Sequence, residues 1–259
     1  MHAKFAICFL ALAGVCSSSP ASDTVFDRSA EISRLAESFK SGTRGAVIDA
    51  SRELFDLGIS DESLAAVIAT RLTADVGSIE ARDKVGQQYL EWMAKGLAST
   101  GVDAAVKVLD EAAGRANHLG ARTFFREEAA KVAWYRGRNA VMANRTLYRE
   151  GDDPQVVRLL NLVVSDDFSH KLFAADRMNW TRALDPRLIA EANAQVLRYM
   201  DTTVTGSSRD QAKTIGMFIK LLGHSGNTNY RDTLQKVLKS RASPQTKKHA
   251  KEALGRLRQ

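Results

Sequence analysis

The side chains that could do chemistry are few in this 259-residue sequence, and their spacing matches no standard catalytic or metal-binding motif. No two histidines after residue 21 fall in H-x-x-x-H or H-E-x-x-H, the patterns that place zinc ligands on one helix face. No nucleophile elbow, phosphate-binding loop or haem-attachment motif is present either. We therefore expect no catalytic residue, metal or cofactor. A site of separated histidines, or an enzyme with an unrecognised site, is the alternative; the histidines are His118, His170, His224 and His249.

Two pairs of adjacent aspartates are the next candidates, Asp152-Asp153 and Asp166-Asp167. Neighbouring carboxylates suit calcium binding or general acid–base chemistry. Each pair also lies at an expected turn, where an aspartate caps a helix and interacts with its positive end. We favour the capping role.

Arginine and aromatic side chains are densest between residues 122 and 138. Arginine, tryptophan and tyrosine are enriched at binding hot spots. The alternative is that the aromatic residues are core residues between helices while the arginines are solvated. The candidate binding residues are Arg122, Phe125, Arg126, Trp134, Tyr135 and Arg138.

The C-terminal segment is strongly basic, with nine Lys or Arg and two acids between residues 231 and 259. Such a run is usually a solvated helix face, and here it suits the outer face of a terminal repeat. The alternative function is binding to an anionic envelope or membrane surface, where each Lys or Arg contributes about 1 kcal/mol. The basic surface would then include Lys247, Lys248 and Lys251.

The first residues are typical of a signal peptide. Lys4 precedes an apolar run from Phe5 to Val15, and small residues at Ser19 and Ala21 suit cleavage after Ala21. The alternative is a buried N-terminal helix. The chain thus divides into a signal peptide, residues 1–21, and one domain, residues 22–259, which we expect to be periplasmic or secreted. The net charge of +7 falls to +6 (7 − 1) with the loss of Lys4. A basic protein suits an anionic partner, but export argues against nucleic acid.

Both cysteines, Cys8 and Cys16, lie in the segment that we expect to be removed. The remaining chain would contain no thiol, which suits an oxidising compartment. A lipoprotein signal with lipid on Cys16 is an alternative, although Val15 stands where bacterial lipoproteins carry a small residue.

These side chains must be positioned by helices, because every segment with a clear pattern has helical periodicity and none alternates as a strand does. One example is Val102, Ala105, Val106 and Leu109. Proline at the first helical position after a capping residue marks helix starts. These starts are Asp153-Pro154, Asp185-Pro186 and Ser243-Pro244, with Ser60-Asp61 and Asn227 as weaker examples.

Turn residues recur along the chain at spacings of 43, 50, 34 and 41 positions. Each stands between a leucine-rich segment and a capped amphipathic one, and glycine at such a point closes a helix in the left-handed conformation. The period predicts an α-solenoid of about five stacked antiparallel helix pairs. The five turn residues are Gly58, Gly101, Gly151, Asp185 and Gly226.

Residues 221–257 resemble a HEAT repeat. A helix ends in Leu222-Gly223, and a short turn follows. A helix with Leu234 and Leu238 comes next, and the last helix carries Ala253-Leu254 after basic residues. Residues 54–72 and 147–167 match the HEAT pattern less specifically. For these segments, tetratricopeptide-like or unclassified helix pairs are alternatives. The resemblance implies an exported bacterial helical-repeat scaffold that binds another protein of unidentified kind through a concave surface.

Overall fold

The computed structural model describes residues 27–202 and 209–257, which form twelve α-helices and no strand. The predicted signal peptide, with Cys8 and Cys16, lies outside the described residues. The helices are α2 (Ser29–Ser41), α3 (Arg44–Leu57), α4 (Glu62–Asp75), α5 (Lys84–Ser99), α6 (Ala104–Arg115), α7 (Leu119–Met142), α8 (Pro154–Val164), α9 (Phe168–Thr181), α10 (Pro186–Tyr199), α11 (Arg209–His224), α12 (Arg231–Lys239) and α13 (Pro244–Arg256).

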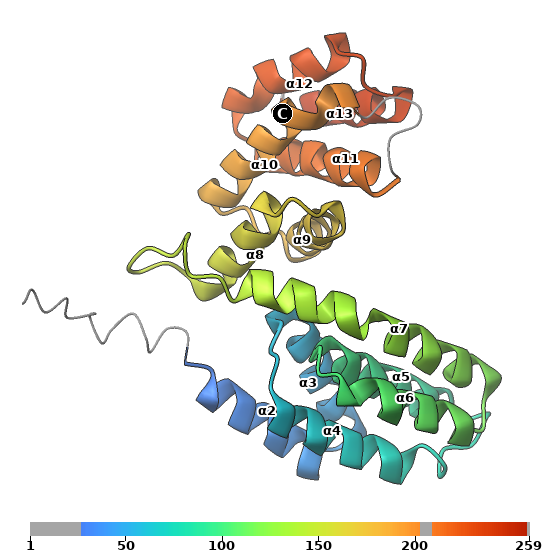
Figure 1. Cartoon of the computed structure of the whole chain (residues 1–259). Helices are drawn as coiled ribbons and strands as arrows, with labels where there is room; N and C mark the ends of the chain where they lie inside the picture. The colour runs from blue at the N-terminus through green and yellow to red at the C-terminus, as the bar shows by residue number, and fades with distance from the viewer. Residues whose placement is uncertain (1–26, 203–208, 258–259) are drawn as a thin grey trace, which may run out of the picture.

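Successive helices pack in pairs, from α2 with α3 to α12 with α13. The odd-numbered helices also pack in series, α3 on α5 on α7 and then α9 on α11 on α13. The even-numbered helices form a second row, α2–α4–α6 and α8–α10–α12. Figure 1 shows the pairs following one another along an elongated molecule. The spacing of the five turn residues predicted about five pairs, whereas the described residues contain six.

The hydrophobic core is divided into two clusters of buried side chains. One belongs to α2–α7, the N-terminal lobe, and the other to α8–α13, the C-terminal lobe. The long helix α7 joins them, because Tyr135 belongs to the first core and Met142 to the second. The lobes meet where α7 packs on α8. No helix in the described residues is both long enough and apolar enough to cross a membrane.

The predicted helix starts are confirmed. The side chains of Asp153, Asp185 and Ser243 accept hydrogen bonds from first-turn amides, each followed by proline. Asp61 caps α4 in the same way. Asn227 instead caps a short 3₁₀ turn, Thr228–Tyr230, and α12 begins after it.

The four predicted glycines all adopt the left-handed conformation, with φ between 62° and 85°. Gly151 nevertheless does not close a helix, because α7 ends at Met142 and a loop precedes α8. The prediction of a leucine-rich helix directly before Gly151 is therefore wrong. Arg182, with φ of 54°, closes α9 without a glycine. The helix α2 carried no repeat signal in the sequence, whereas Gly58, the first predicted turn residue, closes α3.

Candidate binding face

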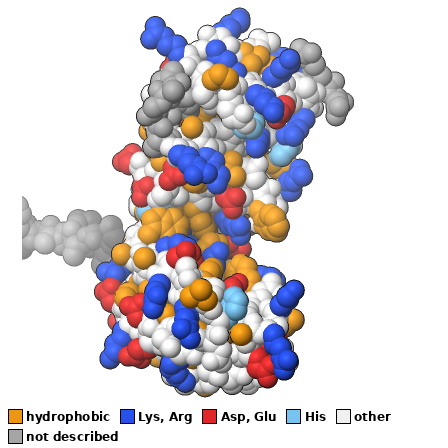
Figure 2. Space-filling model, turned by 90° about the vertical axis from the view of Figure 1, so that its right-hand side faces the viewer, with side chains coloured by type: hydrophobic (Ala, Val, Ile, Leu, Met, Phe, Trp, Pro, Cys, Tyr) orange, Lys and Arg blue, Asp and Glu red, His pale blue; other side chains and the backbone are white. Residues whose placement is uncertain are grey.

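The helices α3, α5, α7 and α9 bring aromatic and cationic side chains together at the junction of the lobes. Phe55 is the centre of the aromatic group, with ring centroids 5.3 Å from Phe173 and 6.0 Å from Tyr135. Figure 2 shows hydrophobic side chains interspersed with Lys and Arg where the molecule narrows between the lobes. We define the basic aromatic face as Arg52, Phe55, Trp92, Lys95, Trp134, Phe173 and Arg177.

Each of the four helices contributes an aromatic residue three or four positions from a Lys or Arg. Residues at this spacing lie on the same side of a helix, and the contacts that Phe55 makes with Lys95 and Phe173, and that Phe173 makes with Trp134, bring the four pairs together. Cations within about 6 Å of a ring centre interact favourably with it. The pairs are Arg52 with Phe55, Trp92 with Lys95, Trp134 with Arg138, and Phe173 with Arg177.

The ammonium of Lys95 lies over two aromatic rings. Its Nζ is 4.0 Å from the ring centre of Phe55 and 5.1 Å from that of Trp92. Burial lowers the pKa of Lys95 below its ordinary value, against an opposing effect of Glu128. Within the described residues no carboxylate lies within ion-pair distance of this ammonium. Lys95 is therefore a half-buried cation without an ion-pair partner among the described residues.

Arg138 is fully buried beneath this face, with 0% of its surface exposed. Its guanidinium carbon lies 4.7 Å from the ring centre of Phe173 and 4.9 Å from that of Tyr135. Its Nε and Nη2 donate to Asn139 Oδ1 at 3.0 and 2.8 Å, while Nη1 has no hydrogen-bond partner. Burial lowers the pKa of Arg138 to about 10. The expectation that the arginines of this region are solvated is thus wrong for Arg138.

Glu128 balances the positive charge on α7. Its side chain is 2% exposed, and Oε1 lies 2.8 Å from the ammonium of Lys131. The hydroxyl of Tyr135 donates to Oε2 at 3.1 Å. Burial and this carboxylate together raise the pKa of Tyr135, so the phenol stays protonated. The polar groups under the aromatic rings are therefore held in fixed positions.

The predicted binding residues divide between two parts of α7. Trp134, Tyr135 and Arg138 meet at the basic aromatic face. Phe125 is fully buried in the core of the N-terminal lobe, and the exposed Arg122 and Arg126 lie about three and two helical turns before Trp134. The residues that were missed come from other helices, and they are Arg52, Phe55, Trp92, Lys95, Phe173 and Arg177. Their signal in the sequence was the repeated aromatic–cation spacing.

The predicted basic surface lies on α13, the last described helix. Lys248 and Lys251 are exposed, and Lys247 is half-buried. Asp153 and Asp167 cap α8 and α9, as expected. Among the described residues, no group of three or more His, Cys, Asp or Glu is placed to hold a metal ion.

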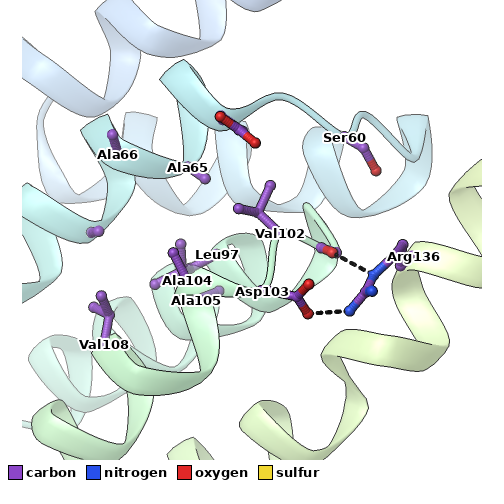
Figure 3. A pocket seen from close by; sticks show the side chains of 13 residues that line it. Ser60, Ala65, Ala66, Leu97, Val102, Asp103, Ala104, Ala105, Val108 and Arg136 are labelled. Carbon is purple, nitrogen blue, oxygen red and sulfur yellow. Dashed lines mark hydrogen bonds and ion pairs between the residues drawn. The ribbon is translucent and has the colours of Figure 1, made fainter.

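A groove of about 620 Å³ lies between α4 and α6. Figure 3 shows its alanine- and valine-rich lining, with Arg136 reaching from α7 to one end. Arg136 forms an ion pair with Asp103 and donates to the carbonyl of Gly101 at 3.2 Å. Because this charged pair is already satisfied, the groove offers mainly apolar contact. Apolar lining residues include Ala65, Ala66, Ala69, Leu97, Val102, Ala104, Ala105 and Val108.

No protein-family model matches this chain, and no curated protein matches it.

Proposed function

We propose that this protein is an exported helical-repeat scaffold that binds another protein through the basic aromatic face. In this proposal the two helix rows are a HEAT-like α-solenoid, and the odd-numbered row supplies the binding surface. The observation that carries the proposal is the convergence of aromatic–cation pairs from α3, α5, α7 and α9 on one surface. Export is supported by the N-terminal sequence alone.

The chemistry of the face specifies an acidic partner segment with apolar side chains. Aromatic and arginine side chains contribute most of the energy at protein interfaces. A cation over an aromatic ring gains about 0.5–1 kcal/mol at an exposed site and about 2 kcal/mol when water is removed. Lys95 is already partly desolvated, so its attraction to an incoming carboxylate is stronger than that of a fully hydrated lysine.

The face is also preorganised. Arg177 is held by Asp56 at 3.0 Å and by Asp176 at 3.2 Å. Trp134 Nε1 donates to the hydroxyl of Ser169 at 2.7 Å. Fixing side chains before binding reduces the conformational entropy that association would otherwise cost.

Affinity capture with a crosslinker, from the exported fraction of the source cells, tests this function. The wild-type chain should recover a discrete partner. Lys95→Glu should reduce the recovery about tenfold, because loss of a hot-spot contact costs at least about 1.4 kcal/mol. Trp92→Ala should act in the same direction.

The matched control is Lys107→Glu, which makes the same charge change on the exposed surface of α6, outside the face. It should leave the recovery unchanged. Failure to capture any partner with crosslinking, or an equal loss in Lys95→Glu and Lys107→Glu, would contradict the proposal.

A further inference from the structure

The C-terminal lobe contains a second cationic feature, separate from the basic aromatic face. Figure 2 shows Lys and Arg side chains gathered around histidines on this lobe. A cavity of about 190 Å³ lies between α11 and α13, and its basic lining residues are Lys213, Lys220 and His249. Pockets for drug-sized ligands measure about 300–1,000 Å³. This cavity therefore accommodates only a small chemical group.

The imidazole of His249 lies against α11 at Gly216. A Cβ at position 216 would stand 3.0 Å from Cδ2 of His249 and 3.5 Å from Nε2. Because Gly216 has no side chain, the imidazole ring can pack directly against the backbone of α11. The Nε2 atom lies 3.1 Å from the side-chain nitrogen of Gln245, which also lines the cavity. The histidine is therefore placed by packing between the two helices.

The charges around His249 are mostly positive. Lys220 on α11 and Lys248 on α13 both disfavour its protonation, while Glu252 on α13 favours it. The Glu252 carboxylate is 3.7 Å from Nδ1, which is too far for a hydrogen bond. Neither Lys213 nor Lys220 has a carboxylate within ion-pair distance in the described chain. The cavity therefore collects two lysines that no acidic group of the described chain neutralises, beside a histidine whose acidic neighbour is Glu252.

The remaining polar lining comes from the first turn of α13. The Ser243 and Thr246 hydroxyls lie 2.9 Å apart, and Ser243 also accepts from the Thr246 amide. One of these hydroxyls donates to the other, so a single O–H is left to donate to a ligand, since a hydroxyl carries one donor and two acceptor sites. Two ammonium groups, an imidazole and a hydroxyl donor match a small oxyanion of double charge.

We propose that the cavity between α11 and α13 binds a phosphate group through Lys213, Lys220 and His249. The group is either free phosphate or the phosphate of an anionic lipid headgroup. The site does not depend on the proposed protein-binding face. A bound dianion favours the protonated imidazole, so phosphate binding raises the pKa of His249.

Nuclear magnetic resonance of the His249 imidazole, titrated with pH at several concentrations of inorganic phosphate, tests the site. The expected result is a saturable rise in the pKa of His249. Lys213→Glu should weaken the phosphate affinity at least tenfold, and this exposed side chain can change without disturbing the fold. Lys236→Glu, on the exposed side of α12, is the matched control and should change the affinity less than twofold.

Vesicles distinguish the two sources of phosphate. The protein should sediment with phosphatidic acid vesicles but not with phosphatidylcholine vesicles if the ligand is a lipid headgroup. Lys213→Glu should then abolish this sedimentation, and Lys236→Glu should not. Binding of inorganic phosphate without vesicle binding would identify a soluble ligand. The proposal is overturned if neither probe binds, or if Lys213→Glu and Lys236→Glu weaken binding equally.

Discussion

Arg177 Nη1 lies 3.0 Å from Asp56 Oδ1, although the two residues are 121 positions apart in the sequence. This ion pair joins α9 of the C-terminal lobe to α3 of the N-terminal lobe. It stands beside the edge-to-face contact between Phe55 and Phe173. The relative position of the lobes is thus fixed by the same side chains that form the basic aromatic face.

The pair should show measurable coupling in a double-mutant cycle. Urea unfolding of Arg177→Ala, Asp56→Ala and the double variant should give a coupling free energy of about 0.5–1 kcal/mol, since both side chains are partly exposed and screened. Strictly additive losses would show that this ion pair does not contribute to holding the lobes together.

Arg138 should matter mainly through its volume. Arg138→Ala and Arg138→Met both lose the hydrogen bonds to Asn139, but methionine still fills the space among the rings. We expect Arg138→Met to be more stable than Arg138→Ala by about 2 kcal/mol in urea unfolding, because alanine leaves a cavity. If both variants lose the same free energy of unfolding, Arg138 stabilises the fold through its hydrogen bonds and not through its volume.

Stability should fall in mildly acidic solution. Burial lowers the pKa of His170, His224 and His249 below the ordinary value. The folded chain therefore binds fewer protons than the unfolded chain as the pH falls through about 6.5, and this lowers the free energy of unfolding. Urea unfolding in buffer without phosphate, between about pH 7.5 and 5, should show this decline in the free energy of unfolding. The range is roughly that over which histidine titrates. His249→Gln should make it shallower, and an unchanged slope would contradict this assignment.

Gly223 permits the close approach of α11 and α13. A Cβ at this position would lie 2.7 Å from the backbone Cα of Ala253, a distance that requires the helices to separate. Gly223→Ala should lower the midpoint of thermal unfolding by several degrees, as an overpacking cost of about 1–3 kcal/mol implies.

Gly255→Ala is the control for this substitution, because a Cβ at position 255 on the neighbouring helix α13 would stand in open space. Alanine favours a helix by about 0.5–1 kcal/mol over glycine, so this variant should be as stable as the wild type or more stable. Similar destabilisation by both changes would remove the packing argument for Gly223.

Local features of the fold were predictable from the sequence. The caps at Asp153, Asp185 and Ser243 and the left-handed Gly58 and Gly101 are each determined by a few neighbouring residues, so short motifs reveal them. The loop before α8 was missed because Leu147 followed by Gly151 is a pattern typical of a helix end. In the structure the side chains of Asn144 and Asp152 instead accept hydrogen bonds from backbone amides of this loop.

The candidate binding site was only partly predictable, because its members meet through tertiary packing. The region around Trp134 and Arg138 was visible as a dense local cluster. Phe55, Lys95 and Phe173 come from three other helices. The helices α3 and α5 pack in series with α7, and Phe173 of α9 meets α7 through the ring of Trp134. Arginine is usually a surface residue, and the burial of Arg138 depends on rings contributed by α3 and α9.

Site-specific photo-crosslinking in the source cells tests the central claim most directly. A photoreactive amino acid with an aromatic side chain at position 92 keeps a ring on the basic aromatic face, and the same amino acid at position 119 replaces a leucine that is 76% exposed on the far end of α7. The account predicts a discrete protein adduct from position 92, its loss when Lys95→Glu is added, and no such adduct from position 119. Absence of an adduct at position 92, or the same adduct from both positions, would contradict it.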